Sequence, residues 1–283
     1  MTDAPRNAAN YCYRHPDRQS FVLCQRCGRT ICGECQTPAA VGVHCPECVR
    51  EARGSAPRVK PAVVTRFRGA AAAGKPVVTY SIMAVTAVVF LLQLLTGVGN
   101  GVVTQALVFY APVEIQQPWR MVTTMFVHGS FWHILFNMYS LYIFGAELER
   151  QLGRARYAAL YFIAGIGGSA AVAVLAPSSV VLGASGAVFG LMAAFFVIAR
   201  SLGSRSIQLL VLVAINLALG FILPSVAWQA HVGGLIAGGA VAFLYSKTRH
   251  RSKRALQTGV LVALGVAVVA ITLLRSAQLI GLL

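Results

Sequence analysis

The sequence predicts an all-α polytopic membrane protein with a small metal-binding domain at its N-terminus. Three observations support this fold class. Of the 283 residues, 57% are hydrophobic and only 11% are charged, against roughly 25% charged residues in an ordinary soluble domain. The apolar residues gather into long segments after position 76. All seven cysteines precede these segments, between positions 12 and 48, which indicates a separate Cys-rich domain.

The Cys-rich domain (1–50) contains four ligand pairs, each with two intervening residues. The pairs are Cys12 and His15, Cys24 and Cys27, Cys32 and Cys35, and Cys45 and Cys48. Eight such ligands are enough for two tetrahedral zinc sites. A segment this short also needs cross-links, such as bound metal ions, to stabilise its small core. Unrelated cytosolic thiols fit this regular pairing poorly. No ligand position has to stay open, so we expect two structural Zn²⁺ ions that are not needed for any chemistry.

The next residues (51–75) are basic and rich in Ala, Gly and Pro, which predicts a flexible linker. A spanning helix needs about 20 mostly apolar residues. Seven segments meet this condition, over 78–97, 131–148, 157–176, 185–200, 206–223, 228–246 and 256–275. The first six form the predicted core (76–246), and a basic loop and the seventh helix follow it (247–283). We expect the 98–130 loop to have structure of its own, and Asn216 to hydrogen-bond to a neighbouring helix.

The basic residues test this helix count. With a cytoplasmic N-terminus, 22 of the 24 Lys and Arg fall in predicted cytoplasmic segments, and only Arg120 and Arg275 fall outside, as the positive-inside rule requires. The net charge of +16 is therefore explained mainly by the basic residues that membrane topology places in cytoplasmic segments. No stacking aromatics interleave the basic runs, so we expect no nucleic-acid binding. The N-terminus lacks the apolar core of a signal peptide. We expect an integral protein of a bacterial plasma membrane with an external C-terminus.

Four polar side chains fall at one depth in the predicted topology. His133 and Asn137 share a face at the start of the second span, Ser185 opens the fourth in GASGAVFG, and His231 opens the sixth. All three spans begin on the outer side. Polar groups inside a membrane are costly and mark functional sites. A serine with a histidine base and donors for an oxyanion is suited to acyl transfer. Because no Asp or Glu lies at this depth, we expect a Ser–His dyad.

The glycines around Ser185 allow another interpretation, a close contact between two helices without chemistry. For Ser185 alone that interpretation is favoured, but its agreement in depth with His231 argues for a site. Gly234 and Gly238 lie three and seven residues after His231. Their small-residue face is expected to bring the sixth helix against the fourth. Phe189, one turn after Ser185, is expected to pack against His231.

At these residues the membrane segment resembles the rhomboid family of intramembrane serine proteases. The resemblance covers roughly 76–246 and rests on Trp119-Arg120, His133-x3-Asn137, Gly183-Ala184-Ser185-Gly186 and Ala230-His231 in this order. It implies that Ser185 is the nucleophile and His231 the base, with His133 and Asn137 in the oxyanion hole. It also implies a structured outer loop at Trp119-Arg120 and a structural role for Glu149. The last helix looks like the extra span of some members.

The Cys-rich segment resembles a B-box-type zinc finger. That family has cross-braced sites, which implies one zinc on Cys12, His15, Cys32 and Cys35 and the other on Cys24, Cys27, Cys45 and Cys48. The family usually ends in histidines, whereas this segment ends in cysteines with His44 adjacent. A domain of this kind is expected to bind a cytosolic protein partner.

The sequence therefore predicts an intramembrane serine endopeptidase that cleaves transmembrane protein substrates near the outer leaflet of the lipid bilayer. An alternative is a non-catalytic membrane adaptor or transporter whose zinc domain recruits a partner. Reaction with a serine-directed probe distinguishes the two.

Overall fold

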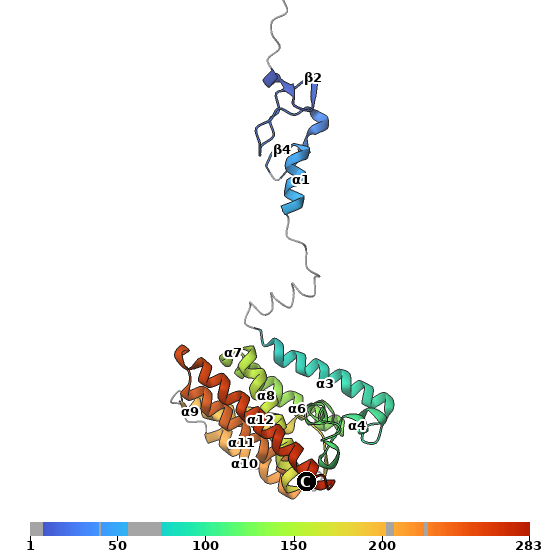
Figure 1. Cartoon of the computed structure of the whole chain (residues 1–283), viewed down its shortest axis with the longest axis vertical. Helices are drawn as coiled ribbons and strands as arrows, with labels where there is room; N and C mark the ends of the chain where they lie inside the picture. Colours follow the sequence, from blue (N-terminus) through green and yellow to red (C-terminus); the bar gives the residue numbers. More distant parts are fainter. Residues whose placement is uncertain (1–7, 40, 56–74, 202–206, 224–225) are drawn as a thin grey trace, which may run out of the picture. The chain divides into compact units, whose positions relative to one another are not determined.

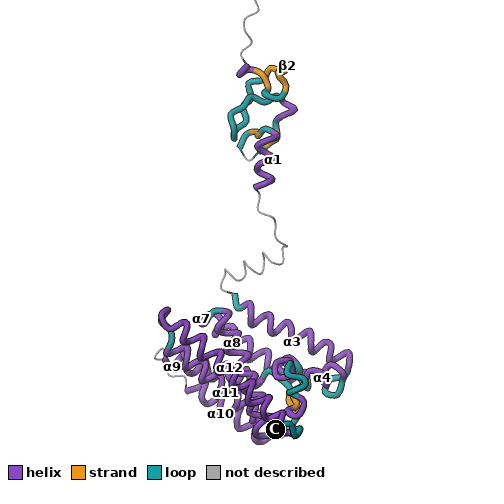
Figure 2. Tube along the Cα trace, viewed as in Figure 1, coloured by secondary structure: helices purple, strands orange, loops and turns teal. Residues whose placement is uncertain are grey.

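The computed structural model describes residues 8–39, 41–55, 75–201, 207–223 and 226–283. The chain divides into two units, one up to Thr65 and one from Arg66. Figure 2 shows that strands are short in both units and that helices dominate the second. The predicted 51–75 linker lies largely outside the described residues.

The first unit has a core made of cysteines. Its elements are η1 (Ala8–Asn10), β1 (Tyr11–Cys12) antiparallel to β2 (His15–Gln19), η2 (Gly33–Cys35), β3 (Thr37–Pro38) antiparallel to β4 (Val43–His44), and α1 (Pro46–Ser55). Six cysteines and Ile31 are buried together, and Cys27 is exposed. The helix α1 continues through Ser55, beyond the predicted domain end at 50.

The second unit contains helices at all seven predicted positions (Figure 1). They are α3 (Val77–Thr96), the α6–η5–α7 segment, α8 (Arg154–Leu175), α9 (Ser185–Ser201), α10 (Ile207–Ile222), α11 (Trp228–Lys247) and α12 (Arg254–Leu279) after η6 (Arg251–Lys253). The second of these runs as α6 (Phe131–Ser140), a π-helical turn η5 (Leu141–Gly145) and α7 (Ala146–Leu152). By length and composition alone, α3, α8 and α12 can each cross a membrane, while α9 and Leu210–Ile222 are shorter apolar helices. The fold is that of a polytopic helical membrane protein.

The 98–130 loop between α3 and α6, called the outer loop here after the side that the sequence predicts for it, is structured, as predicted. It contains α4 (Val102–Leu107), β5 (Phe109–Tyr110), η3 (Ala111–Val113), α5 (Arg120–Thr123) and η4 (Thr124–Phe126). The strand β5 pairs antiparallel with β6 (Val180–Val181), which lies just before α9. The loop is therefore joined to the segment that leads into Ser185.

The helix α11 lies against α9 through glycines on both helices. A Cβ atom added at Gly234 would overlap the carbonyl oxygen of Gly186, and one at Gly238 would overlap the backbone of Gly190. The two backbones are thus closer than any side chain allows, which is the contact that small-residue faces permit in membranes. The prediction that Gly234 and Gly238 bring the sixth helix against the fourth is confirmed.

The helix α8 forms a third glycine face, which the sequence interpretation missed. A Cβ atom at Gly233 of α11 would overlap the carbonyl oxygen of Gly167, and one at Gly168 would come within 2.8 Å of the carbonyl oxygen of Ala230. The signal was present in the glycine cluster at 165–168. Its effect is that α11 is held by close backbone contacts to α8 and α9.

Glu149, in the middle of α7, joins that helix to the start of α3. Its carboxylate accepts the backbone N–H groups of Val78 and Thr79 at 2.9 and 2.8 Å and the Thr79 hydroxyl at 2.8 Å. These N–H groups belong to the first turn of α3, where no helical carbonyl can serve them, and the helix dipole favours a negative charge. The expected structural role of Glu149 is this cap.

Asn216 corrects one expectation. Its amide donates to the carbonyl oxygen of Leu212 in its own helix at 2.9 Å, and the side chain is exposed. The prediction of a hydrogen bond to a neighbouring helix was wrong, because the carbonyl four residues earlier satisfies the donor locally.

Two adjacent glycines of α11 give a matched test of the packing. Gly238→Ala should lower the free energy of unfolding by about 2–3 kcal/mol, because its methyl group meets backbone that cannot repack. Gly239→Ala should be neutral or slightly stabilising, since its Cβ would meet Ala193 at an ordinary 3.8 Å and alanine favours helix. Thermal unfolding in detergent measures both. Equal effects of the two substitutions would contradict the packing described.

Candidate active site and metal centres

Ser185 and His231 meet at the starts of two helices. The Ser185 Oγ and His231 Nε2 atoms lie 3.0 Å apart, a hydrogen bond between the first residue of α9 and the first turn of α11. His231 is buried and Ser185 is half-buried. The glycine contacts between α9 and α11 set this distance, because larger residues there would separate the helices.

Phe189 supports the histidine ring. The two rings are stacked with centroids 4.1 Å apart and an interplanar angle of 12°, so the predicted contact is confirmed. The Nδ1 atom of His231 is buried and has no hydrogen-bond partner within the described part of the chain. The serine hydroxyl can donate to Nε2 only when Nε2 carries no proton, and the neutral ring then has its proton on Nδ1.

The approach to Ser185 is held by the outer loop. Gly183 has φ of +117°, a conformation that other residues rarely adopt, and its N–H donates to the carbonyl oxygen of Thr124 at 3.0 Å. The Thr124 hydroxyl in turn donates to the carbonyl oxygen of Val181 at 2.7 Å. Together with the β5–β6 pair, these bonds determine where the chain enters α9.

His133 lies beside this approach. A Cβ atom at Gly183 would come within 2.6 Å of His133 Nε2, so only glycine leaves room for the imidazole. The side chain of Ser130 caps α6 by accepting the His133 N–H at 3.1 Å. The Gly129 N–H donates to His133 Nδ1 at 3.3 Å, which leaves Nε2 to carry the ring proton. The sequence interpretation missed Ser130, although a serine before an apolar run is a helix-start signal.

Asn137 follows His133 by one turn and is buried. Its amide Nδ2 donates to the carbonyl oxygen of His133 at 2.9 Å. An amide has two N–H donors, and this bond uses one of them. The structure thus brings Ser185 and His231 into direct contact, with His133 beside Gly183 and Asn137 bonded to its own helix.

His128, to which the sequence interpretation gave no role, lies against His133. The two rings meet edge to face with centroids 5.0 Å apart. His128 is fully buried, and Gln93 of α3 holds its backbone through both the N–H group (3.0 Å) and the carbonyl oxygen (3.1 Å). The start of α6 is therefore fastened to α3 next to the candidate site.

Arg120 holds the outer loop together. Its guanidinium donates to the carbonyl oxygens of Gln105 (2.7 Å) and Val108 (2.9 Å) and to Gln117 Oε1 (2.6 Å). Trp119, by contrast, is half exposed. Arg120 therefore holds the loop together by internal hydrogen bonds, while the ring of Trp119 beside it is exposed. The loop at this pair is structured, as expected.

The eight predicted metal ligands form two groups. One contains Cys12, His15, Cys32 and Cys35, and the other contains Cys24, Cys27, Cys45 and Cys48. Within each group the ligand atoms all lie within 4.8 Å of one another. The first group joins the first and third ligand pairs along the chain and the second group joins the second and fourth, which is the cross-braced arrangement. His44 lies in β4 beside Cys45 and belongs to neither group.

The separations between ligand atoms suit tetrahedral zinc. Zn–S bonds of about 2.3 Å and Zn–N bonds of about 2.0–2.1 Å place neighbouring ligands roughly 3.5–3.8 Å apart. His15 Nδ1 lies 3.8, 3.3 and 3.5 Å from the sulfurs of Cys12, Cys32 and Cys35. The sulfurs of Cys27 and Cys45 are 3.7 Å apart. The residues present therefore fit two structural metal ions.

The fold is that of a polytopic helical membrane protein, and one end of its helical bundle carries a hydrogen-bonded serine and histidine, Ser185 and His231. Together they define the class of membrane-embedded serine hydrolases. The Rhomboid domain model matches residues 115–248. The chain is 35% identical over 139 residues to the putative rhomboid protease YdcA of Bacillus subtilis (strain 168), covering 47% of this chain and 70% of YdcA. The chain belongs to the rhomboid family.

Two further relatives extend this comparison. The rhomboid protease GluP of the same bacterium is 35% identical over 205 residues, which cover 68% of this chain and 40% of GluP. RHOMBOID-like protein 6, mitochondrial, of Arabidopsis thaliana is 38% identical over 139 residues, covering 47% of this chain and 45% of that protein. The matched part is thus less than half the length of either relative.

Glu114 gives the outer loop a pH dependence. Burial raises its pKa to about 8, although the Tyr110 N–H and the charge of Arg120 oppose the shift. The folded protein therefore holds this proton more tightly than the unfolded chain, whose pKa is about 4.3. Stability is greatest below that value, falls as pH rises towards about 8, and then levels off.

Glu114→Gln should remove this contribution, on the order of 3 kcal/mol between pH 5 and 9. The measurement is the thermal unfolding midpoint in detergent across that range. The variant's midpoint should fall less steeply than the wild type's. Identical slopes would show that Glu114 does not titrate in this range.

Proposed function

We propose that this chain is an intramembrane serine endopeptidase in which Ser185 is the nucleophile and His231 the general base. The observation that carries the proposal is the 3.0 Å hydrogen bond between Ser185 Oγ and His231 Nε2. A serine hydroxyl is a weak nucleophile unless a positioned base takes its proton. The stacked ring of Phe189 supports the proposal, because it keeps the imidazole in the orientation that faces Ser185.

The proposed reaction has two stages. Ser185 Oγ bonds to the carbonyl carbon of the scissile peptide while its proton passes to His231 Nε2. The tetrahedral intermediate then expels the amine, which takes that proton, and an acyl-enzyme ester remains. A water molecule next gives one proton to His231 and bonds to the ester carbon. Release of the acid returns the proton to Ser185.

The oxyanion of the intermediate needs hydrogen-bond donors at its position. We assign this role to the Ser185 N–H at the start of α9, the His133 ring and the Asn137 amide. The helix dipole adds favourable charge at that end of α9. Support comes from the Gly129 bond to His133 Nδ1, which leaves Nε2 as a donor, and from the second N–H of Asn137.

The proposed substrates are transmembrane proteins that present extended backbone to Ser185 near the outer leaflet. The proposed orientation places the N-terminus in the cytoplasm and the C-terminus outside a bacterial plasma membrane. The domains assigned are a two-zinc domain (1–50 as predicted, with α1 extending it through Ser55), a linker over the rest of 51–75, the catalytic core (76–246) and a basic loop with the last helix (247–283). Residues 76–246 contain every side chain that the reaction needs.

We further propose that the Cys-rich unit is a B-box-like domain that holds two Zn²⁺ ions through its two ligand groups. Bound zinc would supply the cross-links that a unit of this size lacks. Neither ion would take part in peptide cleavage, because each set of four ligands completes a tetrahedron and leaves no open coordination position. A cytosolic protein is the proposed partner of this domain.

A fluorophosphonate probe tests the proposed nucleophile. The wild type in detergent should be labelled, Ser185→Ala should not, and His231→Ala should be labelled roughly 10²–10⁴-fold more slowly because the base is lost. Ser81→Ala is the matched control, since the Ser81 hydroxyl donates only to the carbonyl oxygen of Val77 in its own helix turn. Absence of wild-type labelling and of cleavage of a model transmembrane protein would favour the adaptor or transporter alternative.

Elemental analysis tests the metal sites and their pairing. The wild type should contain about two zinc ions per chain. Cys12→Ala/Cys32→Ala should lower this to about one, because both residues belong to one group, whereas Cys12→Ala/Cys24→Ala should remove both ions. If Cys12→Ala/Cys32→Ala instead removed both ions and Cys12→Ala/Cys24→Ala removed one, consecutive ligand pairs would share a metal. His44→Ala is the control and should keep both ions.

A further inference from the structure

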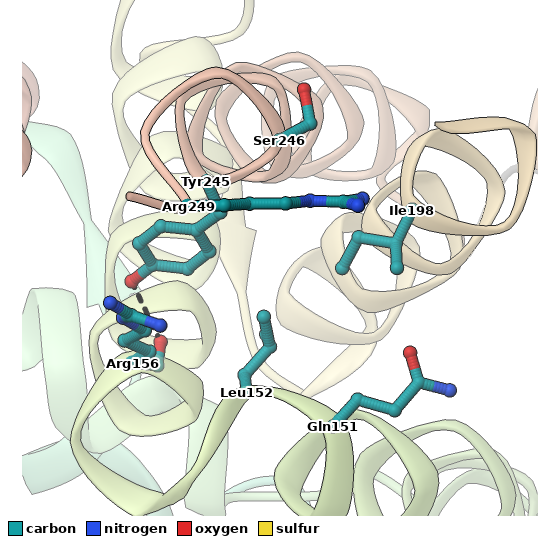
Figure 3. Close-up of a pocket in the computed structure, with 7 residues that line it drawn as sticks. All are labelled: Gln151, Leu152, Arg156, Ile198, Tyr245, Ser246 and Arg249. Atoms are coloured by element: carbon teal, nitrogen blue, oxygen red, sulfur yellow. Dashed lines mark hydrogen bonds between the residues drawn. The ribbon is translucent and has the colours of Figure 1, made fainter. Parts of the chain in front are cut away.

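A pocket of about 320 Å³ lies at the end of the helical bundle opposite Ser185 and His231. It is bounded by the end of α7, the start of α8 and the ends of α9 and α11 (Figure 3). Its lining consists of Gln151, Leu152, Arg156, Ile198, Tyr245, Ser246 and Arg249. Ile198 follows Ser185 by 13 residues along α9, which places the pocket about 20 Å from the candidate active site at 1.5 Å per residue.

Two arginines give this pocket its charge. Figure 3 shows Arg249 extending along one side of the pocket, with the Tyr245 ring between it and Arg156 in this view. Both side chains are held by neutral partners. Arg249 donates to Ser201 Oγ at 2.5 Å, and Arg156 Nε donates to Gln257 Oε1 at 2.9 Å. Each guanidinium has five N–H donors, so donors remain for a ligand.

No carboxylate neutralises these charges among the residues that the structure describes. Glu147 is paired with Arg150 at 2.8 Å and also accepts from Gln151 at 2.8 Å, and the Glu149 carboxylate accepts its hydrogen bonds from the start of α3. The two connections at this end, 149–156 and 247–254, together contain eight Lys and Arg residues. An anion entering the pocket therefore meets a positive field with no competing internal counterion.

The pocket wall also offers apolar surface. Leu152, Ile198 and the buried ring of Tyr245 lie beside the two arginines. A free phosphate ion has no apolar atoms to contact this surface, whereas the glycerol and first acyl carbons of a phospholipid can cover it. Arginine binds phosphate oxygens through parallel hydrogen bonds, and basic pockets between membrane helices suit anionic lipid headgroups.

We propose that this pocket binds the phosphate group of an anionic phospholipid, with Arg156 and Arg249 as its ligands. Bound lipid joins the α7–α8 corner to the ends of α9 and α11. It thus fastens together, at their far ends, the two helices that carry Ser185 and His231. The proposal is independent of the chemistry at Ser185, since lipid binding is measured without substrate.

The test compares lipids by their effect on thermal unfolding of the full chain in detergent. Phosphatidylglycerol should raise the midpoint in a concentration-dependent way, and phosphatidylcholine should raise it less. In Arg156→Gln/Arg249→Gln, the phosphatidylglycerol concentration needed for the same rise in midpoint should increase roughly tenfold for each arginine removed, as expected for lost charged hydrogen bonds. Arg154→Gln/Arg254→Gln is the matched control, with the same charge removed from exposed residues outside the pocket.

Three outcomes would overturn the proposal. An unchanged phosphatidylglycerol effect in the pocket variant excludes these ligands. An equal loss in the control variant indicates diffuse attraction of the basic surface. A variant-sensitive shift with inorganic phosphate but none with phosphatidylglycerol assigns the pocket to a soluble phosphate. If the double variant does not fold, Arg249→Gln alone serves, because this exposed side chain has one partner, Ser201, in the described structure.

Discussion

The close contact of three glycine-lined helices is the constraint on which the rest of the membrane unit depends. In a bilayer, apolar side chains gain little by leaving lipid, so helices associate through close packing and polar bonds. The backbones of α8, α9 and α11 touch where Gly167, Gly186 and Gly234 lie. This contact determines the separation of α9 and α11 and hence the distance between Ser185 and His231. A serine and a histidine that are 46 residues apart in sequence become partners because the glycines at this contact let the backbones of their helices approach closely.

The outer loop adds a second level of control. Hydrogen bonds from Arg120 hold the loop together, and its strand β5 pairs with β6. The carbonyl oxygen of Thr124 in the loop accepts the Gly183 N–H just before α9. The start of α9, which carries Ser185, is thus positioned by two sets of contacts, the glycine packing against α11 and the hydrogen bonds from the loop. The Phe189 ring stacks on the imidazole of His231 and restricts its orientation.

Much of this arrangement was predictable from the sequence, for definite physical reasons. Hydrophobic length and the distribution of Lys and Arg predicted the helices, and equal depth predicted the meeting of Ser185 with His231. Regular spacing predicted the metal ligands. The contacts of α8, the cap that Glu149 provides for α3, and the position of His128 were not predictable, because each depends on which helices become neighbours. Asn216 shows the same limit, since a polar residue in a helix does not reveal whether its partner is local or distant.

The π-helical turn at Leu141–Gly145 has a consequence for how the second span faces its neighbours. In a regular α-helix, Asn137 and Glu149 would point about 120° apart, since successive residues differ by about 100°. The turn absorbs one extra residue and reduces this difference to about 20°. One continuous helix therefore presents both buried side chains to the protein interior, Asn137 near the candidate site and Glu149 at the base of α3. A relative without this turn would need one residue fewer between the two positions to keep both facing inward.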